Sequence, residues 1–588
     1  MISRSSSIEK SRIISRRLFI LVSAKIVLLT GISSRLYNLQ ISDKEKYEIL
    51  SDKNRIREWK TPPQRGIITD YFDNILAEND RVFQVHLSLD EIKNFNKTIF
   101  RLKNILNLTE DEVKKIYKKK QKLKPWDTLV VSENLSWSQF SKLNLYLHDV
   151  EGTKPVLSTS RYYPHANDLV HIIGYVGDAS SKDIENKKEI EKNFVPGLKV
   201  GKSGIESSKE KTLIGSYGIK RYEVNASGKR ISQLDYLKEN QGDKVKITID
   251  LEVQKFAQNL LKGKAGSICA MDIYTGEVLA MASSPTYDPN KFTHGITNKD
   301  WDKIKTNPLR PLINKSIAGL YSPGSTIKPL VALAALEYGT FNPEKLIECK
   351  GHKHPYELYG QKYHCWKKNG HGFMKLRNAL KQSCDIYFYE VARLLGVDKL
   401  SVIAKKYGLG AKVLDDLFLE EKKGIVPSTK WKKQNLEQSW YLGETIITGI
   451  GQGYIQTTPL QLCLMTAQLA NGGHKIKPNI VFDENTSFER VISNIQNNKI
   501  EKLYDNSNNI KFVLDAMFGS TNELYGTSYK SRHKNIKYQF AGKTGTSQVR
   551  RITVAERESD DFRKKEIEWN KRDHALFVGY MPHDKPKY

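Results

Sequence analysis

A serine and a lysine three residues apart are the first pair in this chain that could do chemistry. In the stretch YSPGSTIKP, Ser325 precedes Lys328 directly after a Pro-Gly pair. Residues i and i+3 share one face of a helix, so the lysine amine can reach the serine hydroxyl. A serine needs such a neighbouring base to become a nucleophile. The same spacing also occurs on ordinary helices, so the pair alone does not establish a site.

Two further fragments supply residues for the same chemistry. The fragment KQSCDIYFYE contains Ser383 and Asp385, and FAGKTGTSQV contains Lys543, Thr544, Gly545 and Thr546. Taken singly, the serine and the aspartate could cap a helix, and the lysine could lie on a strand surface. Together with Ser325 and Lys328, however, they give the order S-x-x-K, S-x-[ND], K-[ST]-G, which resembles the signature of penicillin-binding proteins and serine β-lactamases.

The elements that must position these residues can be predicted from the pattern. Residues 244–261 read as a strand followed by an amphipathic helix, and residues 266–290 as a β-hairpin around the turn YTGE. Residues 325–339 read as an apolar helix that ends at a glycine. This order of strands, helices and strands predicts an α+β domain over 246–588, with an antiparallel sheet and a helical subdomain. Residues 39–245 are more polar and form a separate pedestal domain of mixed structure.

The N-terminus predicts a membrane anchor. Several basic residues precede the apolar run LFILVSAKIVLLTGI, which begins at Leu18. The pattern continues without a clear cleavage site, which favours an uncleaved helix at 18–38 over a signal peptide, close to the roughly 20 residues that a bilayer requires. Positive charge favours the cytoplasmic side, so we expect residues 1–17 to form a cytoplasmic tail and the rest to lie outside. Lys25 within the run is unfavourable in lipid.

The strongly basic composition has an ordinary interpretation. The 588 residues carry a formal net charge of +28. Such a charge can indicate a nucleic-acid-binding protein, but no recognition motif of that kind is present. Lysines are spread over nearly the whole chain, which is typical of solvated surfaces. We therefore predict no nucleic-acid partner.

With these motifs, the chain resembles class B penicillin-binding proteins, and most closely the elongation-type penicillin-binding protein 2 of Gram-negative bacteria. An aspartate at 385, where many relatives have asparagine, favours the elongation type over the division type. The resemblance is carried by RGIITDYFDNILAEN (65–79), RYYPHANDLVHIIGYVG (161–177) and GKSGIE (201–206) in the pedestal, and by GETIITGIGQGYIQTTPLQL (443–462) and HALFVGYMP (574–582) in the catalytic domain.

The resemblance implies a serine-type D-Ala-D-Ala transpeptidase or carboxypeptidase. Ser325 would attack the carbonyl of the penultimate D-Ala of a peptidoglycan stem peptide. Lys328 would act as the base once burial and the positive charge of Lys543 favour loss of its proton. Ser383 would relay a proton to the leaving D-Ala amine, and Asp385 would hold this loop and the substrate amide.

The third motif would bind the rest of the substrate. Thr544 and Thr546, with Lys543, would bind its terminal carboxylate, and Gly545 would leave room for the peptide to lie along the strand. The backbone N–H groups of Ser325 and Thr546 would form the oxyanion hole. An amine of a neighbouring stem would then attack the acyl-enzyme and form a cross-link. β-Lactams would acylate Ser325 and remain bound.

A group of cysteines is not needed for this chemistry. Three of the five cysteines fall close together with a histidine. They could form a disulfide with one thiol left over, remain unligated thiols, or form a tetrahedral zinc site. Some elongation-type relatives carry a structural zinc in this region, and carrying that over favours zinc. The other two cysteines, Cys269 and Cys463, lie in apolar stretches and are expected in the core. The implied zinc ligands are Cys349, Cys365, His371 and Cys384.

Three further expectations follow from the resemblance. Relatives continue with another strand and a C-terminal helix, whereas this sequence stops at VGYMPHDKPKY. We therefore expect a short C-terminus and an uncovered sheet edge, which is destabilising. A catalytically impaired scaffold and a division-type transpeptidase remain the alternatives. A SEDS-type glycan polymerase and an MreC-type shape protein are the expected partners, at the inner membrane, with the catalytic domain in the periplasm.

Overall fold

The computed structural model describes residues 4–42, 44, 55–121, 123, 127–186, 188–193, 198–225, 230–351, 354–550 and 567–588. Contacts divide the chain into two compact units, which are described separately. The first contains Met1–Pro63, Val82–Ser158 and Ser216–Asn240, and the second contains Gln64–Arg81, Thr159–Gly215 and Gln241–Tyr588. Part of the predicted pedestal is therefore built into the same unit as the three catalytic motifs.

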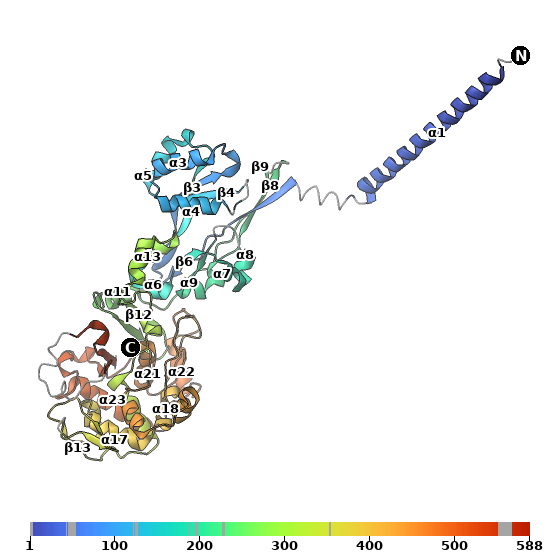
Figure 1. Cartoon of the computed structure of the whole chain (residues 1–588). Helices are drawn as coiled ribbons and strands as arrows, with labels where there is room; N and C mark the ends of the chain where they lie inside the picture. The colour runs from blue at the N-terminus through green and yellow to red at the C-terminus, as the bar shows by residue number, and fades with distance from the viewer. Residues whose placement is uncertain are drawn as a thin grey trace. The chain divides into compact units, whose positions relative to one another are not determined.

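The chain begins with the long helix α1 (Arg4–Tyr37), drawn in blue in Figure 1, which continues into a π-helical turn at Asn38–Ser42. Within Arg16–Ser42, a stretch of 18 residues has a mean hydropathy of 1.7, and none of its residues is buried. Among the described residues, this is the one helix that is long and apolar enough to cross a membrane. The predicted anchor at 18–38 lies within it.

The first unit also contains two small β-structures. Strands β1 (Ile56–Thr61), β8 (Gly218–Val224) and β9 (Arg230–Leu237) form an antiparallel sheet in that order. The second half of β3 (Ile75–Ser88) pairs with β4 (Thr128–Leu135). A core that includes Val85, Leu102, Leu129 and Leu143 joins β3 and β4 to helices α3 (Phe95–Leu106), α4 (Glu110–Lys120) and α5 (Trp137–Leu145).

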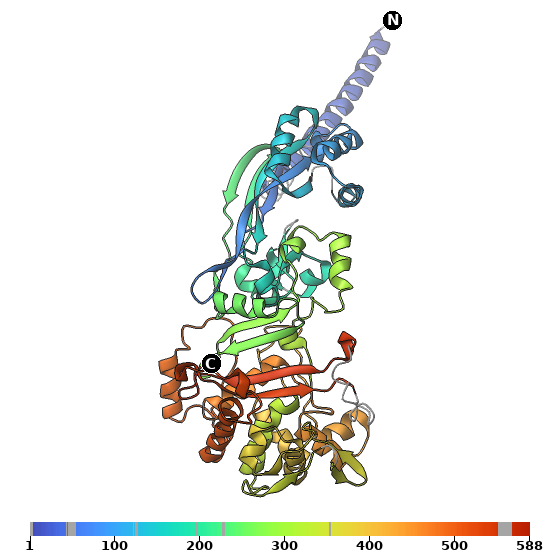
Figure 2. The same ribbon diagram turned by 90° about the vertical axis from the view of Figure 1, so that its left-hand side faces the viewer.

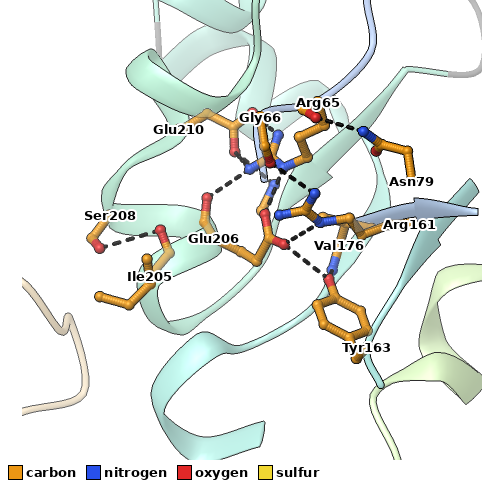
Figure 3. Close-up of polar contacts among 11 residues, drawn as sticks. Arg65, Gly66, Asn79, Arg161, Tyr163, Val176, Ile205, Glu206, Ser208 and Glu210 are labelled. Atoms are coloured by element: carbon orange, nitrogen blue, oxygen red, sulfur yellow. Dashed lines mark hydrogen bonds and ion pairs between the residues drawn. The ribbon is translucent and has the colours of Figure 1, made fainter. Parts of the chain in front are cut away.

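In the second unit, the three pedestal segments that carry the resemblance (65–79, 161–177 and 201–206) meet around a buried cluster of charges (Figure 3). Arg65 donates to Glu206 Oε2 at 2.5 Å and to Glu210 Oε1 at 2.8 Å. Arg161 donates to the other oxygen of Glu206 at 2.6 Å. The hydroxyl of Tyr163 donates to the same oxygen at 3.3 Å. Residues far apart in sequence are thus joined by charged hydrogen bonds away from water.

The catalytic region of this unit consists of β-hairpins packed against helices, as predicted. Strands β11 (Gly266–Met271) and β12 (Val278–Ser284) form the hairpin expected at 266–290. Strands β17 (Ala541–Ser547) and β18 (His574–Tyr580) form a second antiparallel pair, drawn in red in Figure 2. The main helices are α15 (Lys328–Glu337), α17 (Asp385–Leu395), α20 (Leu442–Gly449), α21 (Pro459–Ala470) and α23 (Ser507–Asn522).

An apolar cavity of about 320 Å³ lies between β11, β18 and α21. Cys269 and Cys463 line it, and both also pack against the main core, in line with their predicted place. In the described part of the chain, β11 pairs with β12 and β18 pairs with β17. The last two residues of the chain bind just beyond the ends of β11 and β18: Ile273 N donates to Lys587 O, and Met581 N donates to Tyr588 O. The expected uncovered sheet edge stays a prediction.

Candidate active site

The candidate nucleophile lies in a short 3₁₀ turn, Gly324–Ile327, that leads directly into α15. Gly324 has φ +53°, and a Cβ there would come within 2.6 Å of Thr546 O. Only glycine therefore allows the turn to lie this close to β17. Ser325 is half-buried, whereas Lys328, the first residue of α15, is fully buried. Ser325 is thus partly accessible, and the amine of Lys328 is shielded from water.

The buried amine of Lys328 has three partners from the second motif. Its Nζ donates to Asp385 Oδ1 at 2.7 Å, to Ser383 O at 3.1 Å and to Ser383 Oγ at 3.4 Å. A lysine ammonium has three donors, so all are used. Burial raises the pKa of Asp385, although the charge of Lys328 opposes this shift. The structure therefore brings the S-x-x-K and S-x-D motifs together, as predicted from their order.

Ser383 has an unusual backbone that places it beside Lys328. Its φ is +58°, a left-handed backbone conformation that residues other than glycine and asparagine seldom adopt. The residue ends the helix α16 (Leu376–Lys381), and Cys384 N donates back to Ala379 O at 2.9 Å. Cys384 is then the N-cap residue of α17, and Asp385 begins that helix. The sharp reversal between two helices is what presents the second motif to the site.

The third motif contributes a second buried lysine. Lys543 lies on β17, is fully buried and donates from Nζ to Thr544 O at 2.9 Å. Burial, and next the charge of Lys328, lower the pKa of Lys543 well below its usual value. Gly545 has a close neighbour, because a Cβ there would meet Thr326 Cγ2 at 2.7 Å. In the structure this glycine lets the strand approach the Ser325 turn, whereas the sequence interpretation placed a substrate peptide there.

The two threonines of the third motif differ in surroundings. Thr546 is exposed, and its carbonyl accepts a hydrogen bond from Gln452 Nε2 at 3.2 Å. Thr544 is half-buried, and its Oγ1 donates to Thr527 Oγ1 at 2.8 Å. Sequence reasoning missed Gln452 and Thr527, although Gln452 belongs to the stretch 443–462 that carries the resemblance.

Trp366 is another neighbour that the motifs did not predict. Its backbone N donates to Asp385 Oδ2 at 3.1 Å, and its indole Nε1 donates to Ser383 O at 3.0 Å. The tryptophan therefore bridges both polar residues of the second motif. Its position directly after Cys365 was the one signal in the sequence that could have singled it out.

The four predicted zinc ligands come together, and their candidate ligand atoms all lie within 4.8 Å of one another. Nδ1 of His371 lies 3.5 Å from both Cys349 Sγ and Cys365 Sγ. Nε2 of His371 is buried without a hydrogen-bond partner. All five cysteines are free thiols in the structure. Three sulfurs and one imidazole nitrogen at this spacing fit a tetrahedral zinc ion.

Comparison with known proteins gives the family. The penicillin-binding protein transpeptidase domain matches residues 266–588, and the penicillin-binding protein dimerisation domain matches residues 60–247. The peptidoglycan D,D-transpeptidase MrdA of Acinetobacter baumannii is 33% identical over 98% of this chain and 84% of its own length. MrdA of Escherichia coli K12 is 32% identical over 96% of this chain and 88% of its own length.

Solved structures agree with this relationship. Penicillin-binding protein 2 of Helicobacter pylori, in its complex with MreC, has a TM-score of 0.76 at 29% identity, covering 90% of this chain and 93% of that one. Penicillin-binding protein 2 of Pseudomonas aeruginosa, in complex with WCK 5153, has a TM-score of 0.63 at 31% identity, covering 90% of both chains. The chain therefore belongs to the penicillin-binding proteins, and within them to the elongation-type penicillin-binding protein 2 group of peptidoglycan D,D-transpeptidases.

Proposed function

We propose that this protein cross-links peptidoglycan stem peptides during cell elongation through an acyl-enzyme on Ser325. The observation that carries the proposal is the half-buried Ser325 at the head of α15, with the buried Lys328 bonded to Ser383 and Asp385. A hydroxyl open to substrate beside buried, titratable groups is the arrangement that nucleophilic catalysis requires.

In the acylation step, Ser325 Oγ bonds to the carbonyl carbon of the penultimate D-Ala. The hydroxyl proton passes to Nζ of Lys328, which acts as the base in this step. The C–N bond to the terminal D-Ala then breaks. Ser383 gives its hydroxyl proton to the leaving amine and receives the proton held by Lys328, whose Nζ donates to Ser383 Oγ. The backbone N–H groups of Ser325 and Thr546 bind the oxyanion.

The second half of the reaction transfers the acyl group. The amine of a neighbouring stem peptide attacks the carbonyl carbon of the Ser325 ester. The C–O bond to Ser325 breaks, and the proton that the amine loses returns to Ser325 Oγ. Thr544 and Thr546, with Lys543, hold the terminal carboxylate of the donor before it leaves. β-Lactams imitate this donor, so they acylate the same serine and release slowly.

The proposal is tested by mass analysis of the purified protein after incubation with a penicillin. We expect one adduct per chain, located on the peptide that contains Ser325 and absent from Ser325→Ala. A folded protein without an adduct would contradict the enzyme and support the scaffold. Thr326→Val is not a suitable control, because the Thr326 hydroxyl holds the turn by donating to Pro323 O at 2.6 Å. Ser507→Ala, at an exposed position at the start of α23, is preferable.

We also propose that Cys349, Cys365, His371 and Cys384 hold a structural zinc ion. The support is their spacing, the free thiols and the place of Cys384 between Ser383 and Asp385. When bound, zinc would supply no chemistry to acyl transfer but would hold the second motif in place. Metal analysis should find one zinc per chain, lost in His371→Ala and retained in His354→Ala. Disulfide formation without metal would contradict this site.

The anchor and partners follow from the same family. We propose that the apolar helix spans the inner membrane once, with the two folded units in the periplasm. An MreC-type protein is a proposed partner, supported by the Helicobacter pylori complex, and a SEDS-type polymerase is proposed from the resemblance. Protease protection in intact spheroplasts tests the orientation, since only residues before the anchor should be protected. Co-purification of the full chain with each partner tests the contacts.

A further inference from the structure

Three hydroxyl groups form a continuous chain from the protein interior to the third motif. Ser520 lies on α23 and is fully buried. Its Oγ is 3.1 Å from Thr527 Oγ1, and either atom can be the donor. Thr544 Oγ1 in turn is 2.8 Å from Thr527 Oγ1. Thr527 therefore sits between a buried serine and the threonine that the proposed function assigns to the substrate carboxylate.

The direction of these hydrogen bonds must change when a carboxylate binds. A carboxylate only accepts hydrogen bonds, so Thr544 must donate its proton outward to it. In the structure Thr544 donates inward to Thr527 instead. If all three hydroxyls rotate, Ser520 donates to Thr527, Thr527 to Thr544, and Thr544 to the carboxylate. Hydrogen bonds aligned in this way polarise and strengthen one another.

The loop that carries Thr527 does not need this hydroxyl for its shape. Ser528 N donates to Ser520 O at 3.0 Å, and Gly526 N donates to Glu523 O at 3.0 Å. These backbone hydrogen bonds hold the loop to the end of α23 on both sides of Thr527. The side-chain hydroxyl is thus available to orient Thr544.

We propose that Thr527 is a positioning residue, which turns the Thr544 hydroxyl toward the carboxylate of the substrate with Ser520 as the buried end of the chain. The inference rests on the proposed function, because it assumes that Thr544 binds the carboxylate. It predicts that a change at Thr527 alters the rate of acylation only for substrates and inhibitors that carry this carboxylate.

The test compares acylation of Ser325 by benzylpenicillin and by its methyl ester, which lacks the carboxylate charge. For the wild type we expect faster acylation by the acid. Thr527→Val keeps the side-chain shape, and we expect it to slow acylation by the acid about tenfold and by the ester less than about twofold, since a hydrogen bond to a charged group is affected. Thr527→Ser should restore the wild-type ratio of the acylation rate with the acid to that with the ester. Ser520→Ala should lower this ratio about threefold.

Thr521→Val is the matched control, since Thr521 is a buried neighbour on α23 whose hydroxyl donates back to Met517 O of the same helix. Its ratio of acid to ester rates should equal that of the wild type. If Thr527→Val leaves the ratio of the acid to the ester acylation rate unchanged, whether both rates fall equally or neither falls, the inference is overturned. If Thr527→Val does not fold, Ser520→Ala decides by the same ratio. A wild type that neither compound acylates would instead refute the proposed function.

Discussion

Two buried clusters of charge in the second unit differ in how their charges balance. The cluster in the pedestal segments consists of two arginines and two glutamates, Arg65, Arg161, Glu206 and Glu210 (Figure 3). The active-site cluster has Lys328 and Lys543 but a single carboxylate, Asp385. Both are buried, but in the second cluster one carboxylate stands against two lysines.

The difference in charge balance has different consequences for protonation in the two clusters: Glu206 is favoured in its charged form, whereas Lys543 is favoured in its neutral form. Burial alone would raise the pKa of Glu206, but Arg161 and Arg65 lower it. At Lys543, burial and the charge of Lys328 act together, and its pKa falls well below the usual value. A balanced cluster keeps its groups charged and joins segments of the chain. An unbalanced one shifts a proton equilibrium, which is typical of sites that transfer protons.

The largest expected effect comes from breaking the balanced cluster. Glu206→Gln keeps the shape but leaves Arg65 and Arg161 as buried cations without the carboxylate between them. We expect the free energy of unfolding to fall by about 3–5 kcal/mol, as for other broken buried ion pairs. Urea unfolding followed by circular dichroism measures it. The exposed Glu252, paired with Lys255, is the control, and Glu252→Gln should change little. Equal changes in the two variants would refute the comparison.

The unbalanced cluster should respond in the opposite way. Lys543→Met removes the extra cation and fills similar space with apolar atoms. Stability should remain or increase, because replacing buried charge by apolar side chains is often neutral or stabilising. Acylation of Ser325 by a penicillin should slow about 100-fold, as expected when a charged group of a catalytic site is removed. Stopped-flow acylation and unfolding on the same preparation separate the two effects. A variant that is less stable but fully active would contradict this interpretation.

A smaller effect is expected where backbone spacing, rather than charge, positions the site. In Gly545→Ala, the new methyl would lie 2.7 Å from Thr326 Cγ2, so β17 must move from the Ser325 turn. We expect a loss of stability of about 1–3 kcal/mol, as in other overpacked sites, and slower acylation. Gly295→Ala, where a Cβ meets no atom within 4 Å but φ is +88°, separates backbone strain from overpacking. Only Gly545→Ala should slow acylation.

The smallest effect is a pH dependence of stability. Lys543 has a lowered pKa in the folded protein, whereas its ordinary value is 10.5. Between these two values the unfolded chain binds more protons, so Lys543 makes stability rise with pH. Below the folded pKa the lysine is charged in both states, and the penalty for its burial is fully present. Unfolding of wild type and Lys543→Met across this window should therefore show a difference that narrows as pH rises. Parallel curves would contradict the lowered pKa.

Much of the site could be predicted from sequence because its chemistry requires particular residue types at short spacing. Ser325 and Lys328 lie one turn apart, and Ser383 and Asp385 flank one cysteine. The apolar helix at the N-terminus was equally clear, since its hydropathy depends on composition alone. The four residues of the proposed zinc site were predicted from the resemblance, and the structure brings them together.

The amino-acid sequence by itself determined the fold class, the reactive motifs and the apolar N-terminal helix, because each is a local pattern of residue types. Tertiary structure alone decided which groups share a buried environment. Arg65 and Glu206 lie 141 residues apart, and Lys328 and Asp385 lie 57 apart. Thr527 and Trp366 had no motif of their own and became neighbours of the site only through packing. Burial and the distance between charges set pKa values and hydrogen-bond direction, and neither can be derived from local spacing.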